Sequence, residues 1–340
     1  MRRTLSIGPF EAASGAVASG LAKIGELADG VTLVQVPVVI INGRDDGPLL
    51  YLHAGSHGQE TIYSVELLRR LRSEIDAAEL KGAIIAVPLA NLLAHQVATR
   101  VPPHYAAREG VAFAGDIHKL WPGDARGSLT QRIVHFLWTN IVRQADVAID
   151  LHAVGEPGIP FTFMYRGGKR DAQGTPAWEK TLALARAFGV TMVTTAPNPL
   201  TLAGACLDDG KPALMIEMTK SRMQDEGTIA TALRGIRNVL IELRMLAGAI
   251  EPQRDVRVVD GVHPALPTIR AEHGGLIRFE VACGDLVPAG AVIARIRDVF
   301  GNELEAIRMP ADGYVMTFPA QSWVGNQAVA TGDLVADIFA

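Results

Sequence analysis

Two histidines and one glutamate occur where a metal site would need them. His57 and Glu60 follow a short apolar run at 48–55, and His152 follows another at 146–151. Open α/β sheets bind ligands at the carboxyl ends of their strands, so these side chains would meet at one edge of a sheet. Two imidazoles and a carboxylate, with a fourth position left to water, form the ligand set of catalytic zinc. We therefore predict His57, Glu60 and His152 as metal ligands.

Each half of this pattern also has an ordinary explanation. A single histidine at a strand end is more often a hydrogen-bonded structural residue than a ligand, and a His-Gly-x-Glu turn alone is a short pattern. The two halves together favour the metal site, because each one follows a predicted buried strand.

Zinc hydrolysis also needs a proton acceptor and benefits from a fixed cation. Glu217 ends the apolar run 213–216, where partial desolvation would let it take a proton from water and return it to a leaving amine. Arg100 ends a loop-like stretch that begins at Asn91, and its charge could stabilise a carbonyl oxygen. The alternatives are a Glu217 paired with a basic residue of 220–222 and an Arg100 that is an ordinary surface residue.

Buried strands and amphipathic helices alternate along the part of the chain that must position these residues. Continuous apolar runs predict strands, and apolar residues spaced three or four apart predict helices. The predicted strands are 31–41, 48–55, 83–88, 146–152, 191–195 and 213–217, and the predicted helices are 60–76, 130–143, 176–188 and 228–249. This alternation predicts an α/β fold with a mixed, largely parallel sheet flanked by helices.

The pattern changes after residue 253. Short alternating stretches separated by glycine turns follow, at 275–279, 292–296 and 313–316, and no long helix fits among them. A chain of 340 residues also exceeds the usual size of a single hydrophobic core. We predict a catalytic domain at 1–253 and a small all-β domain at 254–340.

The segments 284–290 and 310–315 of this second domain resemble biotinyl- and lipoyl-type β domains, which carry their cofactor on a lysine. No lysine occurs after Lys220, so the domain is expected to be unmodified. We predict that it narrows the substrate cleft.

Composition excludes several classes of protein. The chain has 32 Lys and Arg against 36 Asp and Glu, a net charge of −4, and no run of five basic residues, so nucleic acid is not an expected partner. Two cysteines exclude a disulfide scaffold and a four-cysteine zinc site. Polar residues and prolines interrupt the long uncharged runs, so no membrane partner is expected. We expect a cytoplasmic protein, and the sequence leaves association into a homo-oligomer open.

Taken together, four motifs resemble the succinylglutamate desuccinylase/aspartoacylase family, which belongs with the zinc carboxypeptidase fold. The motifs are Gly55-Ser56-His57-Gly58-Gln59-Glu60, Asn91 with Arg100, Asp150-Leu151-His152, and Glu217. The resemblance implies one zinc ion per chain, bound by His57, Glu60 and His152. It further implies that Glu217 is the general acid and base and that Arg100 polarises the carbonyl and stabilises the tetrahedral oxyanion.

One motif departs from the family. The family usually carries Asp-Leu-Asn-Arg, whose Asn and Arg hold a substrate carboxylate, and this chain has Asp116-Ile117-His118-Lys119 instead. Lys119 keeps the charge without the planar two-point grip of arginine. His118 can donate or accept a hydrogen bond. We take Asn91, His118 and Lys119 as candidate substrate-binding residues and leave the acyl group and the amine open.

The function predicted from these residues is that of a zinc-dependent amidohydrolase. It would remove the acyl group from a small-molecule substrate, an N-acylated amino acid or small amine. A zinc carboxypeptidase acting on short peptides is an alternative, although a β domain that narrows the cleft argues against it. A non-catalytic metal- or ligand-binding protein is a second alternative, but such a protein would have no need of Glu217.

Overall fold

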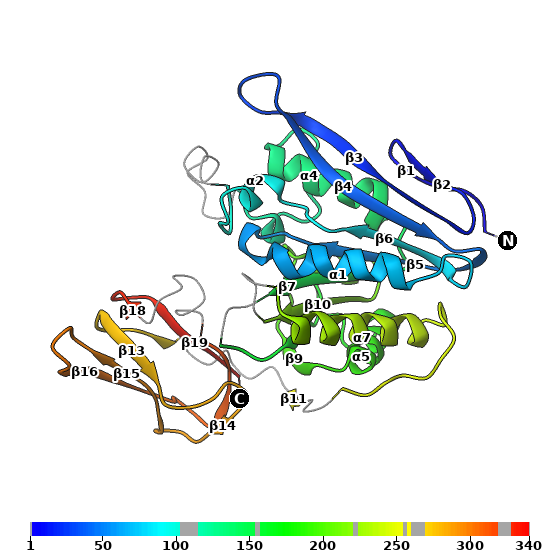
Figure 1. Cartoon of the computed structure of the whole chain (residues 1–340). Coiled ribbons are helices and arrows are strands. Elements are labelled where there is room, and N and C mark those ends of the chain that lie inside the picture. The colour runs from blue at the N-terminus through cyan, green and yellow to red at the C-terminus, as the bar shows by residue number, and fades with distance from the viewer. Residues whose placement is uncertain are drawn as a thin grey trace.

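A nine-stranded mixed sheet forms the centre of the larger part of the molecule (Figure 1), in the order β11-β9-β8-β10-β7-β5-β6-β4-β3. The structure is a computed structural model that describes residues 2–102, 115–153, 157–219, 224–253, 257–259, 269–318 and 328–339. The strands are β3 (Ala16–Glu26), β4 (Leu33–Asn42), β5 (Asp45–Ala54), β6 (Lys81–Val87), β7 (Val147–Ala153), β8 (Phe161–Tyr165), β9 (Thr191–Thr195), β10 (Ala213–Met218) and β11 (Val258–Val259). Neighbouring strands are parallel except at β3–β4, β4–β6 and β8–β10, which confirms the predicted mixed, largely parallel sheet.

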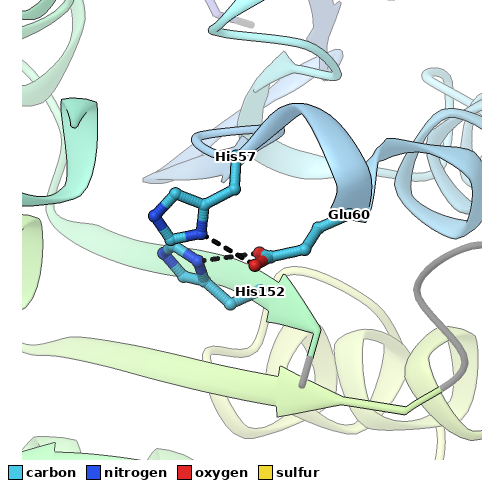
Figure 2. Close-up of side chains that lie close together, drawn as sticks. All are labelled: His57, Glu60 and His152. Carbon is cyan, nitrogen blue, oxygen red and sulfur yellow. Dashed lines mark hydrogen bonds and ion pairs between the residues drawn. The ribbon is translucent and has the colours of Figure 1, made fainter. Parts of the chain in front are cut away.

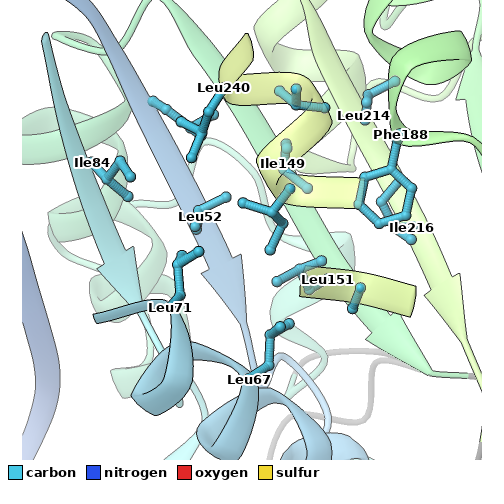
Figure 3. Packing of buried hydrophobic residues seen from close by; sticks show 14 of the residues in the cluster. Leu52, Leu67, Leu71, Ile84, Ile149, Leu151, Phe188, Leu214, Ile216 and Leu240 are labelled. Atoms are coloured by element: carbon cyan, nitrogen blue, oxygen red, sulfur yellow. The ribbon is translucent and has the colours of Figure 1, made fainter. Parts of the chain in front are cut away.

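Helices cover both faces of this sheet. They are α1 (Thr61–Glu74), α2 (Leu92–His95), α4 (Leu129–Leu137), α5 (Pro176–Phe188), α6 (Leu202–Asp208) and α7 (Glu226–Glu242). Side chains of α1, α5 and α7 pack on one face, against residues such as Leu52 and Ile149 (Figure 3), and those of α4 and α6 pack on the other, against residues such as Tyr51. Because successive strand residues point to opposite faces, a strand buried on both sides is apolar throughout.

The helix ends show where local sequence signals were sufficient. Thr175 caps α5 by accepting a hydrogen bond from the backbone of Trp178, and Pro176 is its first residue, as predicted. The helix predicted at 228–249 ends at Glu242 instead. Arg244 takes a φ of 59°, in the left-handed region, and this stops the helix seven residues early.

The N-terminal strands were not predicted. β1 (Leu5–Ile7) and β2 (Phe10–Ala12) form a small antiparallel pair, and β3 is an edge strand of the large sheet. Six of the eleven residues of β3 are small and five of its positions are exposed, so it lacks the buried apolar run by which the other strands were recognised.

Two four-stranded antiparallel sheets follow at the C-terminus (Figure 1), in the orders β12-β19-β17-β14 and β16-β15-β13-β18. Their strands are β12 (Ile269–Arg270), β13 (Gly275–Phe279), β14 (Leu286–Val287), β15 (Val292–Arg297), β16 (Glu303–Arg308), β17 (Gly313–Thr317), β18 (Ala328–Val329) and β19 (Leu334–Phe339). Ile277, Ile293 and Val335 are among the residues of their common core. The predicted small all-β part is therefore present.

The two parts of the molecule touch along the start of β8. The backbone amide of Ile159 donates to the carbonyl of Met316 (3.0 Å), and that of Phe318 donates to Pro157 (3.1 Å). The ring of Phe339 packs against Phe161. The division at 253/254 stays a prediction, and β11, which lies beyond it, still pairs with β9 of the large sheet.

None of the helices in the described ranges is long and apolar enough to cross a membrane.

Candidate active site

The turn after β5 brings His57 and Glu60 together. Gly55 has a φ of 69°, and a Cβ at Gly58 would overlap the backbone of Ala94, so both positions need glycine. His57 lies at the start of the short 3-10 helix Gly58–Glu60, with its Nδ1 2.8 Å from Glu60 Oε1. Both side chains are buried.

His152 completes this cluster from β7. Its Nδ1 lies 3.1 Å from Glu60 Oε2, so that both imidazoles turn a nitrogen towards the same carboxylate (Figure 2). One ligand atom from each of the three residues lies within 4.8 Å of the others. Two imidazole nitrogens and a carboxylate oxygen suit zinc in kind and in number. The structure thus brings the three predicted ligands together in an arrangement that fits the ion.

A second carboxylate, that of Asp116, contacts the ring nitrogen of His57 that does not face Glu60. Asp116 is fully buried, with Oδ1 3.1 Å from His57 Nε2, and Arg100 Nε donates to Asp116 Oδ2 (3.1 Å). Burial opposes ionisation of Asp116, but hydrogen bonding and charge from His57 and the charge of Arg100 outweigh it and lower the pKa of Asp116. Arg100 therefore sits next to the cluster, and its side chain is one-third exposed.

Glu217 lies beside His152. β10 pairs in parallel with β7, and in this register Glu217 is opposite His152. The side chain of Glu217 makes no hydrogen bond or ion pair within the described part of the chain, and the basic residues at 220 and 222, its alternative partners, lie outside that part. Burial, with the charges of Glu60 and Asp150, raises the pKa of Glu217 to about 8.

The three candidate substrate-binding residues differ in their surroundings. Asn91 accepts from the backbone of Ala94 (3.2 Å) and donates to the carbonyl of Ser56 (3.1 Å), so its amide supports the loop before His57. His118 packs its ring 4.8 Å from that of His152. Lys119 is half-buried and forms no ion pair with any residue in the described ranges, and burial lowers its pKa.

Other supporting residues were given no role from the sequence. Tyr63 of α1 donates its hydroxyl hydrogen to the carbonyl of His152 (2.7 Å), a contact without any local sequence signal. Asp116 precedes His118 and Lys119 in one motif, and Asp150 precedes His152 by two residues, which places both side chains on one face of β7. These spacings were available signals.

Comparison with known proteins identifies the family to which the chain belongs. Residues 46–243, more than half of the chain, match the succinylglutamate desuccinylase/aspartoacylase catalytic domain. The chain belongs to this family, which is a family of deacylases, and the resemblance inferred from the sequence is confirmed.

Individual relatives agree with this assignment. An N-alpha-acetyl-L-2,4-diaminobutyric acid deacetylase from Halomonas elongata is 27% identical over 314 residues, which cover 90% of this chain and 87% of the relative. A succinylglutamate desuccinylase/aspartoacylase structure from Rhodobacter sphaeroides has a TM-score of 0.78 at 26% identity and covers 95% of each chain. The ectoine utilization protein EutE (DoeB) from Ruegeria pomeroyi, with a TM-score of 0.79 at 21% identity, covers 95% of this chain and 94% of its own and shares the fold.

Proposed function

We propose that this protein is a zinc-dependent deacylase that hydrolyses the amide bond of an N-acylated amino acid or small amine. The observation that carries the proposal is the buried convergence of His57, Glu60 and His152, with Glu217 opposite His152 on the next strand. Membership of a deacylase family supports the reaction class.

His57, Glu60 and His152 would hold one zinc ion per chain. The ion, when bound, supplies a Lewis acid that acidifies water and polarises a carbonyl oxygen. Asp116 faces the other ring nitrogen of His57, and this contact fixes which nitrogen of that ring carries the proton.

Glu217 would act as the general base and then as the general acid. Burial raises its pKa in the metal-free protein, and the charge of a bound zinc ion would favour the carboxylate form that accepts a proton. In the first step the carboxylate takes a proton from water as the water oxygen bonds to the amide carbon. In the second step the C–N bond breaks, and the departing nitrogen receives that proton.

Arg100 would stabilise negative charge on the carbonyl oxygen. Asp116 holds its guanidinium through Nε, and the two Nη groups have no partner among the described residues. A guanidinium fixed in this way needs little reorganisation when charge develops on the substrate.

Lys119 would receive an anionic group of the substrate, since a half-buried ammonium with no acidic partner among the described residues favours an anion. His118, its neighbour, would contact another polar group of the substrate. The name of the Halomonas relative makes N-acetyl-2,4-diaminobutyrate a good first substrate to test. A cytoplasmic location and association into a homo-oligomer stay predictions.

A deacylation screen tests the proposal. Zinc-loaded protein is incubated with N-acetyl, N-succinyl and N-formyl derivatives of amino acids and diamines, with short peptides alongside, and the released amines are quantified. We expect one class of N-acyl compound to be hydrolysed, with loss of activity on chelation and recovery on addition of zinc. Hydrolysis of peptides alone would favour the carboxypeptidase alternative, and hydrolysis of nothing in zinc-loaded protein would contradict a catalytic role.

A further inference from the structure

A buried carboxylate that the proposed mechanism does not use lies among three imidazole rings. Asp150 is on β7 and is 1% exposed. Its Oδ1 lies 3.1 Å from His152 Nε2 and 3.9 Å from His53 Nε2, and its Oδ2 lies 3.8 Å from His118 Nδ1. The three rings reach it from β7, β5 and the short turn at 117–119.

His53 is engaged elsewhere. Its Nδ1 lies 2.8 Å from the hydroxyl of Tyr51, and its Nε2 lies 2.7 Å from the hydroxyl of Ser56. Both nitrogens therefore have closer partners than Asp150. The protons that satisfy the carboxylate must come from the other two rings.

The remaining polar atoms at this point are enclosed and unpaired. Within the described structure, both carboxylate oxygens of Asp150, Nδ1 of His118 and Nε2 of His152 are buried and lack a hydrogen-bond partner of good geometry. Buried polar groups in proteins are nearly always paired, and a buried charge is strongly disfavoured without partners. Small rotations would pair these four atoms with one another, provided that each ring carries its proton on the side that faces Asp150.

The opposite nitrogen of His152 gives an independent reason for this proton position. Nδ1 of His152 faces Glu60 in the cluster proposed to hold zinc, and a nitrogen that binds a metal carries no proton. The proton of His152 then sits on Nε2 and points to Asp150 Oδ1. His57 has the same arrangement, with Nδ1 facing Glu60 and Nε2 facing Asp116.

We propose that Asp150 is a positioning residue that holds His152 and His118 each in one tautomer, with the protons on Nε2 and Nδ1 respectively. The inference rests on the proposed metal site. Its consequence for the substrate is that His118 keeps only Nε2 for contact, as an acceptor. The asparagine usual in the family can also donate a hydrogen bond at this position. Neutral His118 can only accept one there, from a substrate amine, amide or hydroxyl group.

The first test determines the proton positions in the wild-type protein, and variants serve only to assign the signals. Protein labelled with ¹⁵N-histidine and loaded with zinc is studied by long-range ¹H–¹⁵N correlation spectroscopy, with His118→Gln and His53→Gln used to assign the rings. We expect His118 to be protonated on Nδ1 and His152 on Nε2. A proton on Nε2 of His118, or a zinc-free His152 Nδ1, would overturn the proposal.

The second test uses Asp150→Asn, with Asp146→Asn as the matched control. Asp146 lies just before the same strand, and its carboxylate accepts from the backbone of Leu49, away from the cluster. We expect the Asp150 variant to bind zinc roughly 10- to 100-fold more weakly in competition with a chelating dye, and the Asp146 variant to match the wild type. Melting of the metal-free proteins shows whether each variant is folded.

Three results of this second test distinguish the proposals. Wild-type protein that binds no zinc would contradict the proposed function itself. Wild-type protein that binds one zinc ion with the same affinity as a folded Asp150→Asn variant would contradict only the positioning role. Two zinc ions per chain, of which one is lost in His118→Gln, would overturn it as well, because Asp150 would then be a direct ligand.

Discussion

Glu217 of β10 lies directly opposite His152 of β7 in the parallel register of the two strands. Paired residues of neighbouring strands point to the same face of a sheet, so the proposed base and a proposed zinc ligand lie on the same face. The side chain of Glu217 is 8% exposed, and it forms no hydrogen bond or ion pair with any described residue. A buried, unpaired carboxyl group beside a histidine cluster is the feature that separates this site from a purely structural metal site.

Replacing Glu217 by glutamine should abolish turnover without removing the metal. The amide keeps the shape of the side chain but cannot carry a proton between water and the leaving nitrogen. We expect kcat to fall by roughly 10²- to 10⁴-fold while the zinc content stays at the wild-type value. Glu179→Gln, at an exposed position of α5, is the matched control and should leave both quantities unchanged. Near-normal turnover in Glu217→Gln would contradict the assignment.

The raised pKa of Glu217 also predicts how stability depends on pH. The unfolded chain releases this proton near the ordinary value of 4.5, whereas the folded protein holds it up to about 8. Between these values the unfolded state binds fewer protons, so the contribution of Glu217 is fully present below pH 4.5 and is lost as the pH rises through 8.

Urea unfolding of the metal-free protein at pH 5 and pH 8.5 measures this effect. The free energy of unfolding of the wild type should fall relative to that of Glu217→Gln by on the order of 4 kcal/mol between the two conditions. The variant serves as the reference because the other titrating groups are common to both proteins. An equal pH dependence of the two proteins would show that Glu217 has an ordinary pKa.

Local signals explain how much of the fold could be predicted. The signals for the strand at 191–195 and for the cap at Thr175 each lie within a few neighbouring residues, and the structure has both as predicted. The order of the strands could not be read in this way, because it depends on contacts between distant segments. The small residues of β3 gave no signal, since an exposed edge strand needs few large apolar side chains.

The site divides along the same line. His57 and Glu60 are three residues apart on one turn, so their contact is local and was predicted from spacing. Asp116 contacts His57, which lies 59 residues away in the sequence, and no pattern within either segment predicts that contact. The position of Glu217 opposite His152 likewise requires β10 to lie next to β7, which only the assembled sheet decides.

Removing the guanidinium of Arg100 should slow the reaction more than it weakens zinc binding. Asp116 is buried but keeps its contacts with His57 and with the backbone amide of His118, so loss of the Arg100 ion pair should affect zinc binding less than the reaction. Loss of the charge near the carbonyl oxygen should lower kcat/KM roughly 10²- to 10³-fold in Arg100→Ala. Arg72→Ala, on the exposed side of α1, controls for the change in net charge. A large loss of zinc with little change in kcat would instead assign Arg100 a structural role.

Lys119 should determine whether the protein prefers a substrate that carries a negative charge. Its half-buried ammonium has no acidic partner in the part of the chain that the structure describes, so a substrate anion is the partner that would satisfy it. For Lys119→Met we expect KM for an N-acyl amino acid to rise at least about tenfold, because a charge-assisted contact contributes about 1.5–3 kcal/mol, with kcat nearly unchanged. The matching carboxamide should bind both proteins equally, and Lys119→Arg should retain affinity for the acid. Equal KM values for acid and carboxamide in the wild type would show that Lys119 does not recognise charge.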